Sequence, residues 1–233
     1  MDFDSQLRAI RALLRTHSDA RLALETEIKE IEIFSKSVSG IANDHAIDEW
    51  VDRLHESVFQ DAAHSMAAVG MLAPFIEALF KRAFPGVKEL LGTKDFRKKV
   101  DHPRWQMIDD KIFNCRFSCN GNLNIVAGIS ELSDALGMDE FMPPGLGEVL
   151  GALFHYRNKM FHFGFEWPIS ERRIFKENIR NAGWPSDWFL ESMTGDETWI
   201  FYMSHVFVAH SLDTFREVIS GLGKFVREFH KTG

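Results

Sequence analysis

Apolar residues recur at steps of three and four positions over most of the chain, with charged residues between them. Residues at this spacing lie on one face of an α-helix, so the pattern predicts long amphipathic helices. The sequence has no alternating strand pattern, internal repeat or low-complexity tract. We therefore expect an all-α fold built around a bundle of four to five long helices. The first helix is expected from about residue 5 to residue 34, with an interruption near residue 17 as an alternative, and its apolar face would consist of Leu7, Ile10, Leu14, Leu24, Ile28 and Ile31.

The second expected helix begins at Asn43 or Asp44, because either side chain can cap a helix N-terminus. Pro74 should kink this helix, and Pro85-Gly86 should end it. Two stretches, residues 85–122 and the Trp-rich residues 165–196, are interpreted as insertions packed on the core. We expect a single domain over residues 1–233. Later helices are expected at about residues 123–136, 147–163, 170–181 and 198–229.

The composition is that of an ordinary globular protein, with 45% hydrophobic and 26% charged positions in 233 residues. A net charge of -7 excludes a polybasic nucleic-acid binder, so any contact with RNA must use a local basic patch. The candidate patch is the stretch TKDFRKKVDHPRW at residues 93–105, with Trp105 available for stacking on a base. The alternative is that this stretch is ordinary solvated surface.

Two cysteines, Cys115 and Cys119, are too few for a disulfide framework and lack partners for a zinc site. Reduced, buried thiols in a cytoplasmic protein are therefore expected. The N-terminal sequence lacks the pattern of a signal peptide, and the longest uncharged stretches are shorter than the roughly 20 residues that span a bilayer. No HExxH motif or carboxylate-histidine cluster appears, so neither a metal nor a cofactor is expected.

The segment FHYRNKMFHFG at residues 154–164 is the most informative part of the sequence. On a helix, Asn158 and His162 share one polar face, so Asn158 can orient the imidazole. Arg157 and His162 are five positions apart, which is about 140° around an ideal helix. The two side chains can meet only through the reach of Arg157, a distorted helix end or a second copy of the chain.

This segment resembles the HEPN superfamily of all-helical nucleotide-binding and RNase domains. Their signature is an arginine followed after four to six residues by a histidine, often with an asparagine directly after the arginine. RNKMFH at residues 157–162 fits this pattern in its spacing and in Asn158. Glu77, in an earlier long helix, is at a place where such domains often carry an acidic residue.

The resemblance implies a metal-independent endoribonuclease that cleaves RNA by attack of the 2′-hydroxyl and leaves a 2′,3′-cyclic phosphate. It implies His162 as general acid/base, Arg157 as stabiliser of the phosphorane and Asn158 as an orienting or phosphate-binding group. Histidine exchanges protons near neutral pH and arginine stays protonated, so the residue types suit this chemistry. The resemblance also implies a homodimer with a composite site, RNA as the partner, and a role as a toxin or defence effector with a possible antitoxin or regulatory protein.

Each of these roles has a structural alternative. His162 can serve as a helix-end cap, and Arg157 can form an ion pair with Glu77. The alternative function is a non-catalytic helical dimer that binds a nucleotide, RNA or a protein partner.

Overall fold

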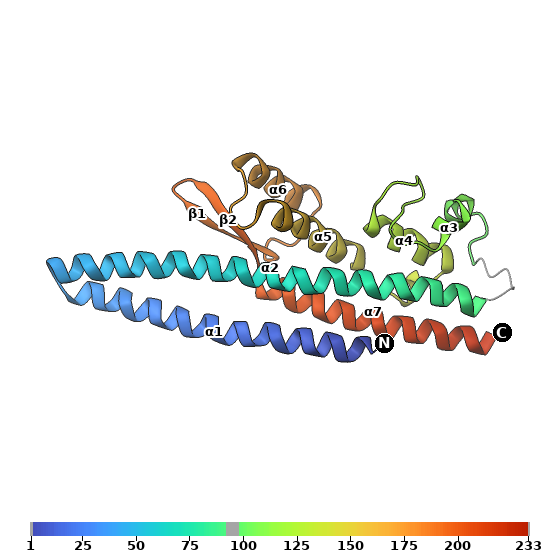
Figure 1. Ribbon diagram of the computed structural model, residues 1–233, viewed down its shortest axis with the longest axis horizontal. Coiled ribbons are helices and arrows are strands. Elements are labelled where there is room, and N and C mark those ends of the chain that lie inside the picture. Colours follow the sequence, from blue (N-terminus) through green and yellow to red (C-terminus); the bar gives the residue numbers. More distant parts are fainter. Residues whose placement is uncertain (1, 92–97, 233) are drawn as a thin grey trace. The chain divides into compact units, whose positions relative to one another are not determined.

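The structure is a computed structural model that describes residues 2–91 and 98–232 (Figure 1). The described residues are mostly helical, as predicted, and they also contain a small two-stranded antiparallel sheet that was not predicted. The helices are α1 (Phe3–Ser37), α2 (Ile41–Leu91), α3 (Asp109–Ile112), α4 (Ile125–Leu136), α5 (Leu146–Phe163), α6 (Ile169–Asn181) and α7 (His205–Thr232), with 3₁₀ turns η1 (Pro103–Gln106) and η2 (Asp139–Phe141). The strands are β1 (Phe189–Thr194) and β2 (Glu197–Met203).

The chain divides into two compact units. Unit 1 consists of Met1–Leu7, Met71–His155 and His210–Gly233. Unit 2 consists of Arg8–Gly70 and Tyr156–Ala209. Helices α2 and α5 each contribute one part to each unit, and the expectation of a single domain stays a prediction.

Unit 1 has an apolar core in which aromatic rings stack. Phe75 of α2 contacts Phe3 edge-on at 5.8 Å and stacks on Phe215 of α7 at 6.2 Å. Gly221 of α7 lies so close to the carbonyl oxygen of Phe141 that a Cβ at this position would overlap it. A glycine at residue 221 therefore allows α7 to approach η2. The other fully buried core residues include Leu72, Ile76, Phe80, Phe84, Ile129, Leu132, Leu136, Val149, Leu153 and Val218.

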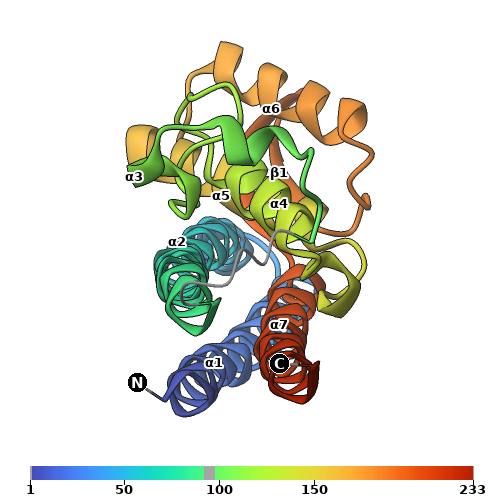
Figure 2. The same ribbon diagram turned by 90° about the vertical axis from the view of Figure 1, so that its right-hand side faces the viewer.

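A buried arginine organises the irregular segment between η1 and α4 in unit 1. Arg104 is 0% exposed, and its guanidinium donates hydrogen bonds to four backbone carbonyls. Helix α4 packs on the same segment, because a Cβ at Gly128 would overlap the carbonyl oxygens of Cys115 and Phe117. Figure 2 shows α3 and α4 on the same side of α2. The carbonyls bound by Arg104 are those of Lys111, Ile112, Asn114 and Phe117.

Unit 2 has an aromatic core around Tyr156 of α5. The Tyr156 hydroxyl is buried and donates a hydrogen bond to the carbonyl oxygen of Phe201 at 3.0 Å. Trp167 stacks on Phe201 at 5.7 Å, and Phe175 of α6 meets Phe201 edge-on at 5.1 Å. Trp188 stacks on Phe207 at 4.5 Å. Tryptophans of the predicted 165–196 insertion therefore lie in a packed core that includes α6 and β1.

The last helix begins later than predicted. We expected helix from about Thr198, whereas Glu197–Met203 is strand β2, which pairs with β1 around a two-residue turn at Gly195 and Asp196. Gly195 has a φ of +59°, as the tight turn of a β-hairpin requires. The Ser204 hydroxyl then accepts a hydrogen bond from the backbone N–H of Phe207 at 3.1 Å and caps α7.

Three features of α1 and α2 also differ from the predictions. Helix α1 continues through residue 17 without the interruption considered above, and α2 continues past Pro85 to Leu91. Burial of the apolar residues Phe84 and Val87 accompanies this continuation despite the cost of a proline in a helix. Asn43 does not cap α2, because its amide donates hydrogen bonds to the carbonyls of Ser35 at 2.6 Å and Val38 at 3.4 Å.

Helix α2 over Ile41–Leu90 is the one stretch of the described chain that is long and apolar enough to cross a membrane. Half of its most apolar window is buried in the structure. A core helix has the same length and composition, so this feature does not by itself indicate a membrane protein.

Candidate functional site

The predicted motif lies in the last two turns of α5, in unit 2. Gly164 follows the helix with a φ of +71°, and its N–H donates to the carbonyl oxygen of Met160 at 3.0 Å. The Trp167 indole N–H then donates to the carbonyl oxygen of Gly164 at 2.8 Å. Because Trp167 is itself part of the buried aromatic core, these two hydrogen bonds attach the end of α5 to the core of unit 2.

Arg157 is half-buried and is held by two neighbours on its own helix. Its Nη1–H donates to Oδ1 of Asn158 at 3.3 Å, and the guanidinium lies over the ring of Phe161 at 5.6 Å. The ring and the amide limit the rotamers that the long side chain can adopt. Arg157 is therefore partly preorganised.

His162 is exposed at the end of the helix, and its ring lies 6.3 Å from that of Phe163. Among the described residues, no side chain makes a hydrogen bond or ion pair with its imidazole. Asn158 contacts Arg157 and does not orient His162 in the structure. One copy of the chain thus brings Arg157 and Asn158 together and leaves His162 apart from both.

The same end of α5 also carries a lysine that forms an ion pair and two exposed aromatic residues. Lys159 forms an ion pair with Glu171 of α6, so its charge is used to attach α6 to α5. Phe161 is 59% exposed and Phe163 is 40% exposed. An exposed pair of large aromatic residues beside the motif is a surface that another molecule can cover.

Glu77, the predicted supporting residue, belongs to unit 1. Its Oε1 accepts hydrogen bonds from Nε and Nη2 of Arg116 at 3.2 Å and 3.0 Å and also binds the ammonium of Lys81. Burial raises the pKa of Glu77, but the hydrogen bonds from Lys81 and Arg116 outweigh this and hold it below its usual value. Glu77 is therefore ionised at neutral pH, and its partners are Lys81 and Arg116.

The predicted basic patch is only partly described, because residues 93–97 lie outside the described residues. Lys98 forms an ion pair with Glu140 at 3.4 Å, and Lys99 forms one with Asp134. These carboxylates reduce the positive charge that the two lysines could offer to the phosphates of RNA.

Arg104 and Trp105, which also belong to the predicted patch, have structural contacts. Arg104 is the buried residue that binds backbone carbonyls, so its guanidinium is not available to RNA. The indole N–H of Trp105 donates to the carbonyl oxygen of Lys99 at 2.7 Å. Arg104 was therefore wrongly assigned to the surface, because nothing in the sequence marks an arginine as buried.

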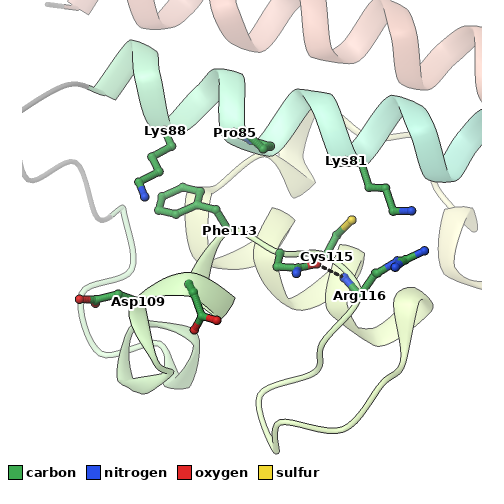
Figure 3. A pocket seen from close by; sticks show the side chains of 9 residues that line it. Lys81, Pro85, Lys88, Asp109, Phe113, Cys115 and Arg116 are labelled. Atoms are coloured by element: carbon green, nitrogen blue, oxygen red, sulfur yellow. Dashed lines mark hydrogen bonds between the residues drawn. The ribbon is translucent and has the colours of Figure 1, made fainter.

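A pocket in unit 1 was not predicted from the sequence (Figure 3). Its volume is about 470 Å³, and it lies between α2 and the segment that Arg104 organises. We call it the Arg116 pocket. The available signal in the sequence was a pair of lysines about two helical turns apart, at positions 81 and 88 of α2. Only the fold brings residues 109–116 against them. The pocket is lined by Lys81, Pro85, Lys88, Asp109, Asp110, Phe113, Asn114, Cys115 and Arg116.

Both cysteines have thiols with raised pKa values. Burial raises the pKa of Cys115 to about 11. Burial, together with the neighbouring Glu131 carboxylate, raises the pKa of Cys119 to about 11. The thiolate is the reactive form, so both thiols are poor nucleophiles at neutral pH.

We expect both cysteines to react with iodoacetamide at pH 7.5 about 100-fold more slowly in the folded protein than in urea, because two pKa units reduce the thiolate fraction by that factor. The rate in the folded protein should rise as the pH approaches 11. Mass spectrometry of the peptides measures each cysteine separately. Equal rates in the folded and urea-unfolded chains would contradict the shifted pKa values.

No group of three or more histidine, cysteine or carboxylate side chains gathers into a metal-binding arrangement within residues 2–91 and 98–232. The chemical groups available at the end of α5 are therefore a fixed guanidinium, an amide and an exposed imidazole. Comparison of the chain with protein-family models, with curated proteins and with solved structures found no match.

Proposed function

We propose that this protein is a metal-independent endoribonuclease of the HEPN type that acts in the cytoplasm. The observation that carries the proposal is the arrangement at the end of α5. There Arg157 is half-buried and held by Asn158 and Phe161, while His162 is exposed one turn later. A held cation and an accessible proton-transfer group are the two components that cleavage of RNA through its own 2′-hydroxyl requires.

In the proposed reaction, the 2′-oxygen attacks the adjacent phosphorus and the bond to the 5′-oxygen breaks. His162 exchanges the proton of the attacking hydroxyl or of the leaving oxygen, and its exposure leaves it accessible to RNA. Arg157 donates hydrogen bonds to the phosphorane oxygens, and Asn158 supports the guanidinium. The products carry a 2′,3′-cyclic phosphate and a 5′-hydroxyl.

We also propose that the helices of each chain form a bundle and that two chains form a homodimer. Arg157 contacts Asn158 and the His162 ring lies near Phe163, and no hydrogen bond joins Arg157 to His162 among the described residues, which supports a site completed by a second copy. The exposed rings of Phe161 and Phe163 adjoin the motif and supply apolar surface for such a contact. A second chain would then bring the His162 of one protomer toward the Arg157 of its partner.

The resemblance to HEPN proteins favours a toxin or defence role, with an antitoxin or another regulatory protein as a further partner. An unregulated endoribonuclease would degrade the RNA of its own cell, so an antitoxin or regulatory protein that inhibits it is consistent with this activity. RNA is the proposed substrate. Because the chain has a net charge of -7, it must bind RNA through local cations such as Arg157, and such cation–phosphate contacts predict cleavage that weakens as salt is raised.

The test is incubation of a mixed RNA pool with the purified protein in EDTA, followed by analysis of the product ends. We expect cleavage without metal, cyclic phosphate ends, and loss of activity when Arg157 and His162 are both replaced by alanine. Arg15→Ala combined with His45→Ala is the matched control, since both residues are exposed on α1 and α2 outside the motif. Equal activity of the two double variants would show that any cleavage comes from elsewhere.

A non-catalytic dimer that binds a nucleotide, RNA or a protein partner is the second candidate. The pairing of Lys159 with Glu171 favours it, because it removes one cation from the face that would meet RNA. If the wild-type protein binds RNA or a partner but leaves RNA intact at every salt concentration, this second function replaces the first.

A further inference from the structure

The Arg116 pocket has the size and the mixed lining of a small-molecule site. Its volume of about 470 Å³ lies within the range of roughly 300–1,000 Å³ that such sites occupy. One wall is α2, and the other is the segment Asp109–Arg116. Every lining residue belongs to unit 1, and none of them belongs to the motif at the end of α5.

One end of the pocket carries two cations that share a single carboxylate oxygen. Lys81 and Arg116 both bind Oε1 of Glu77, with the Arg116 Nη2 at 3.0 Å. Arg116 is exposed by about half. One carboxylate opposes two positive charges, which leaves this end with a net charge of +1. A phosphate would supply several oxygens to a guanidinium fork and an ammonium that now compete for one.

The middle of the pocket is apolar and aromatic. Figure 3 shows the Phe113 ring beside Lys88, on the side of Pro85 that faces away from Lys81 and Arg116. The ammonium of Lys88 lies 5.7 Å from the centre of that ring. Cys115 stays an uncharged thiol at neutral pH, because burial raises its pKa to about 11. This part of the pocket therefore suits a flat, uncharged ring.

The other end of the pocket limits the charge of a ligand. Asp109 lies at the end opposite Lys81 and Arg116 (Figure 3), and Asp110 follows it on α3. Two carboxylates at this end would repel a second anionic group. The lining therefore selects a ligand with one anionic group at the Arg116 end and an uncharged body along Phe113.

The wall that bears Phe113 and Arg116 is already formed without a ligand. Arg104 binds the carbonyls of residues on both sides of Phe113, including Ile112 at 2.7 Å and Asn114 at 2.7 Å. The side chain of Asn114 in turn accepts a hydrogen bond from the backbone N–H of Arg116 at 3.1 Å. A preformed wall lowers the ordering cost of binding.

We propose that the Arg116 pocket binds a small phosphate monoester whose body is an aromatic ring. The phosphate lies between Lys81 and Arg116, and the ring lies on Phe113. Glu77 competes with the phosphate for the two cations, so it sets how tightly the ligand binds. This site does not depend on RNA cleavage, and it exists whether or not the motif on α5 is catalytic.

The test measures binding of phenyl phosphate to the full chain by calorimetry and by NMR. We expect a dissociation constant of about 1 mM or lower, with shifts of the amides of residues 113–116. Inorganic phosphate and phenol, which are the two halves of the probe, should each bind about tenfold more weakly or worse. Arg116→Gln should weaken phenyl phosphate about tenfold, because it removes the fork.

Glu77→Gln should have the opposite effect and tighten binding several-fold, because both cations lose their competitor while the side chain keeps its shape. Lys224→Gln on α7 is the matched control, since it removes one exposed charge of unit 1 outside the pocket and should leave binding unchanged. Circular dichroism checks that each variant is folded.

Four results would overturn the proposal. The first is that phenyl phosphate, at a concentration about 10 times the expected dissociation constant, does not bind to the wild-type protein. The second is that the wild-type protein and the Arg116→Gln variant bind phenyl phosphate with equal affinity. The third is weaker binding by a folded Glu77→Gln variant, which would mean that Glu77 is a ligand contact and not a competitor. Equal affinity for phenyl phosphate and inorganic phosphate would exclude the aromatic body.

Discussion

Mixing the Arg157→Ala and His162→Ala variants is expected to restore about a quarter of the wild-type RNA cleavage, although each variant alone is inactive. Each substitution should reduce cleavage about 100-fold or more, because it removes either the cation on the phosphorane or the proton-transfer group. Restoration requires that Arg157 of one chain works with His162 of the other.

The expected fraction follows from counting composite sites. The proposed wild-type dimer would have two, and each would contain one arginine and one histidine from different chains. In the mixed dimer one site lacks both groups and the other has both, so half of its sites are intact. Random exchange makes about half of all dimers mixed, which gives about a quarter of the wild-type sites.

The measurement is the rate of RNA cleavage in EDTA after the two variants have been mixed and allowed to exchange subunits. A chain with both substitutions, mixed equally with wild type, is the control. Its mixed dimers lack one group in each composite site, so cleavage should fall to the roughly one quarter that the remaining wild-type dimers supply. If both residues act within one chain, the two single variants stay inactive after mixing. That result would reject the composite site while leaving ribonuclease activity itself to the test of the wild-type protein.

Helical periodicity was sufficient to predict most of the secondary structure, and the arrangement of the helices in a bundle stays a prediction. The predicted bounds of α4, α5 and α6 agree with the observed ones within a few residues. In α4 the apolar spacing corresponds to a buried face that contains Ile129, Leu132 and Leu136. The prediction was wrong at Thr198–Met203, where TWIFYM has aromatic and β-branched residues that suit a strand as well as a buried helix. Pairing with β1 across the Gly195-Asp196 turn stabilises the strand conformation of this segment. A search for apolar residues at steps of three or four positions does not detect such pairing.

The candidate site was predicted in its position but not in its contacts. The sequence placed Arg157, Asn158 and His162 on one helix, and α5 contains all three. The orientation of Asn158 toward Arg157 depends on rotamers, which spacing does not determine. The Arg116 pocket depends on the path of residues 109–116, and that path is set by Arg104, whose burial no local pattern indicates.

Replacing Arg104 with methionine is expected to destabilise unit 1 by about 3–5 kcal/mol, which is the usual cost of removing one partner from a buried charged network. The guanidinium is fully buried and donates to four carbonyls, and it also lies 3.5 Å from a carboxylate oxygen of Glu131. Methionine fills much of the space but donates no hydrogen bond. The carbonyls would then have to find water, which requires the segment between η1 and α4 to open.

Burial lowers the pKa of Arg104, since it penalises the charged form, while the neighbouring Cys119 and Glu131 act in the opposite direction. The buried charge of Arg104 therefore has an unfavourable desolvation free energy, and the methionine variant does not have it. This saving is smaller than the loss of four carbonyl partners, because each buried carbonyl left without a donor costs roughly 1–3 kcal/mol. Lysine keeps the charge but lacks the planar fork, so Arg104→Lys should also destabilise the protein.

Urea unfolding measures the change in the free energy of unfolding, and amide hydrogen exchange at residues 111–117 shows whether the loss is local. Arg116→Met is the matched control, because its guanidinium is half exposed and its ion pair with Glu77 should contribute less than about 1 kcal/mol. The Arg104→Met variant should also lose phenyl phosphate binding, since the wall that bears Phe113 and Arg116 is no longer fixed. Stability and exchange equal to those of the wild-type protein would show that packing alone forms this segment, and that the buried arginine does not organise it.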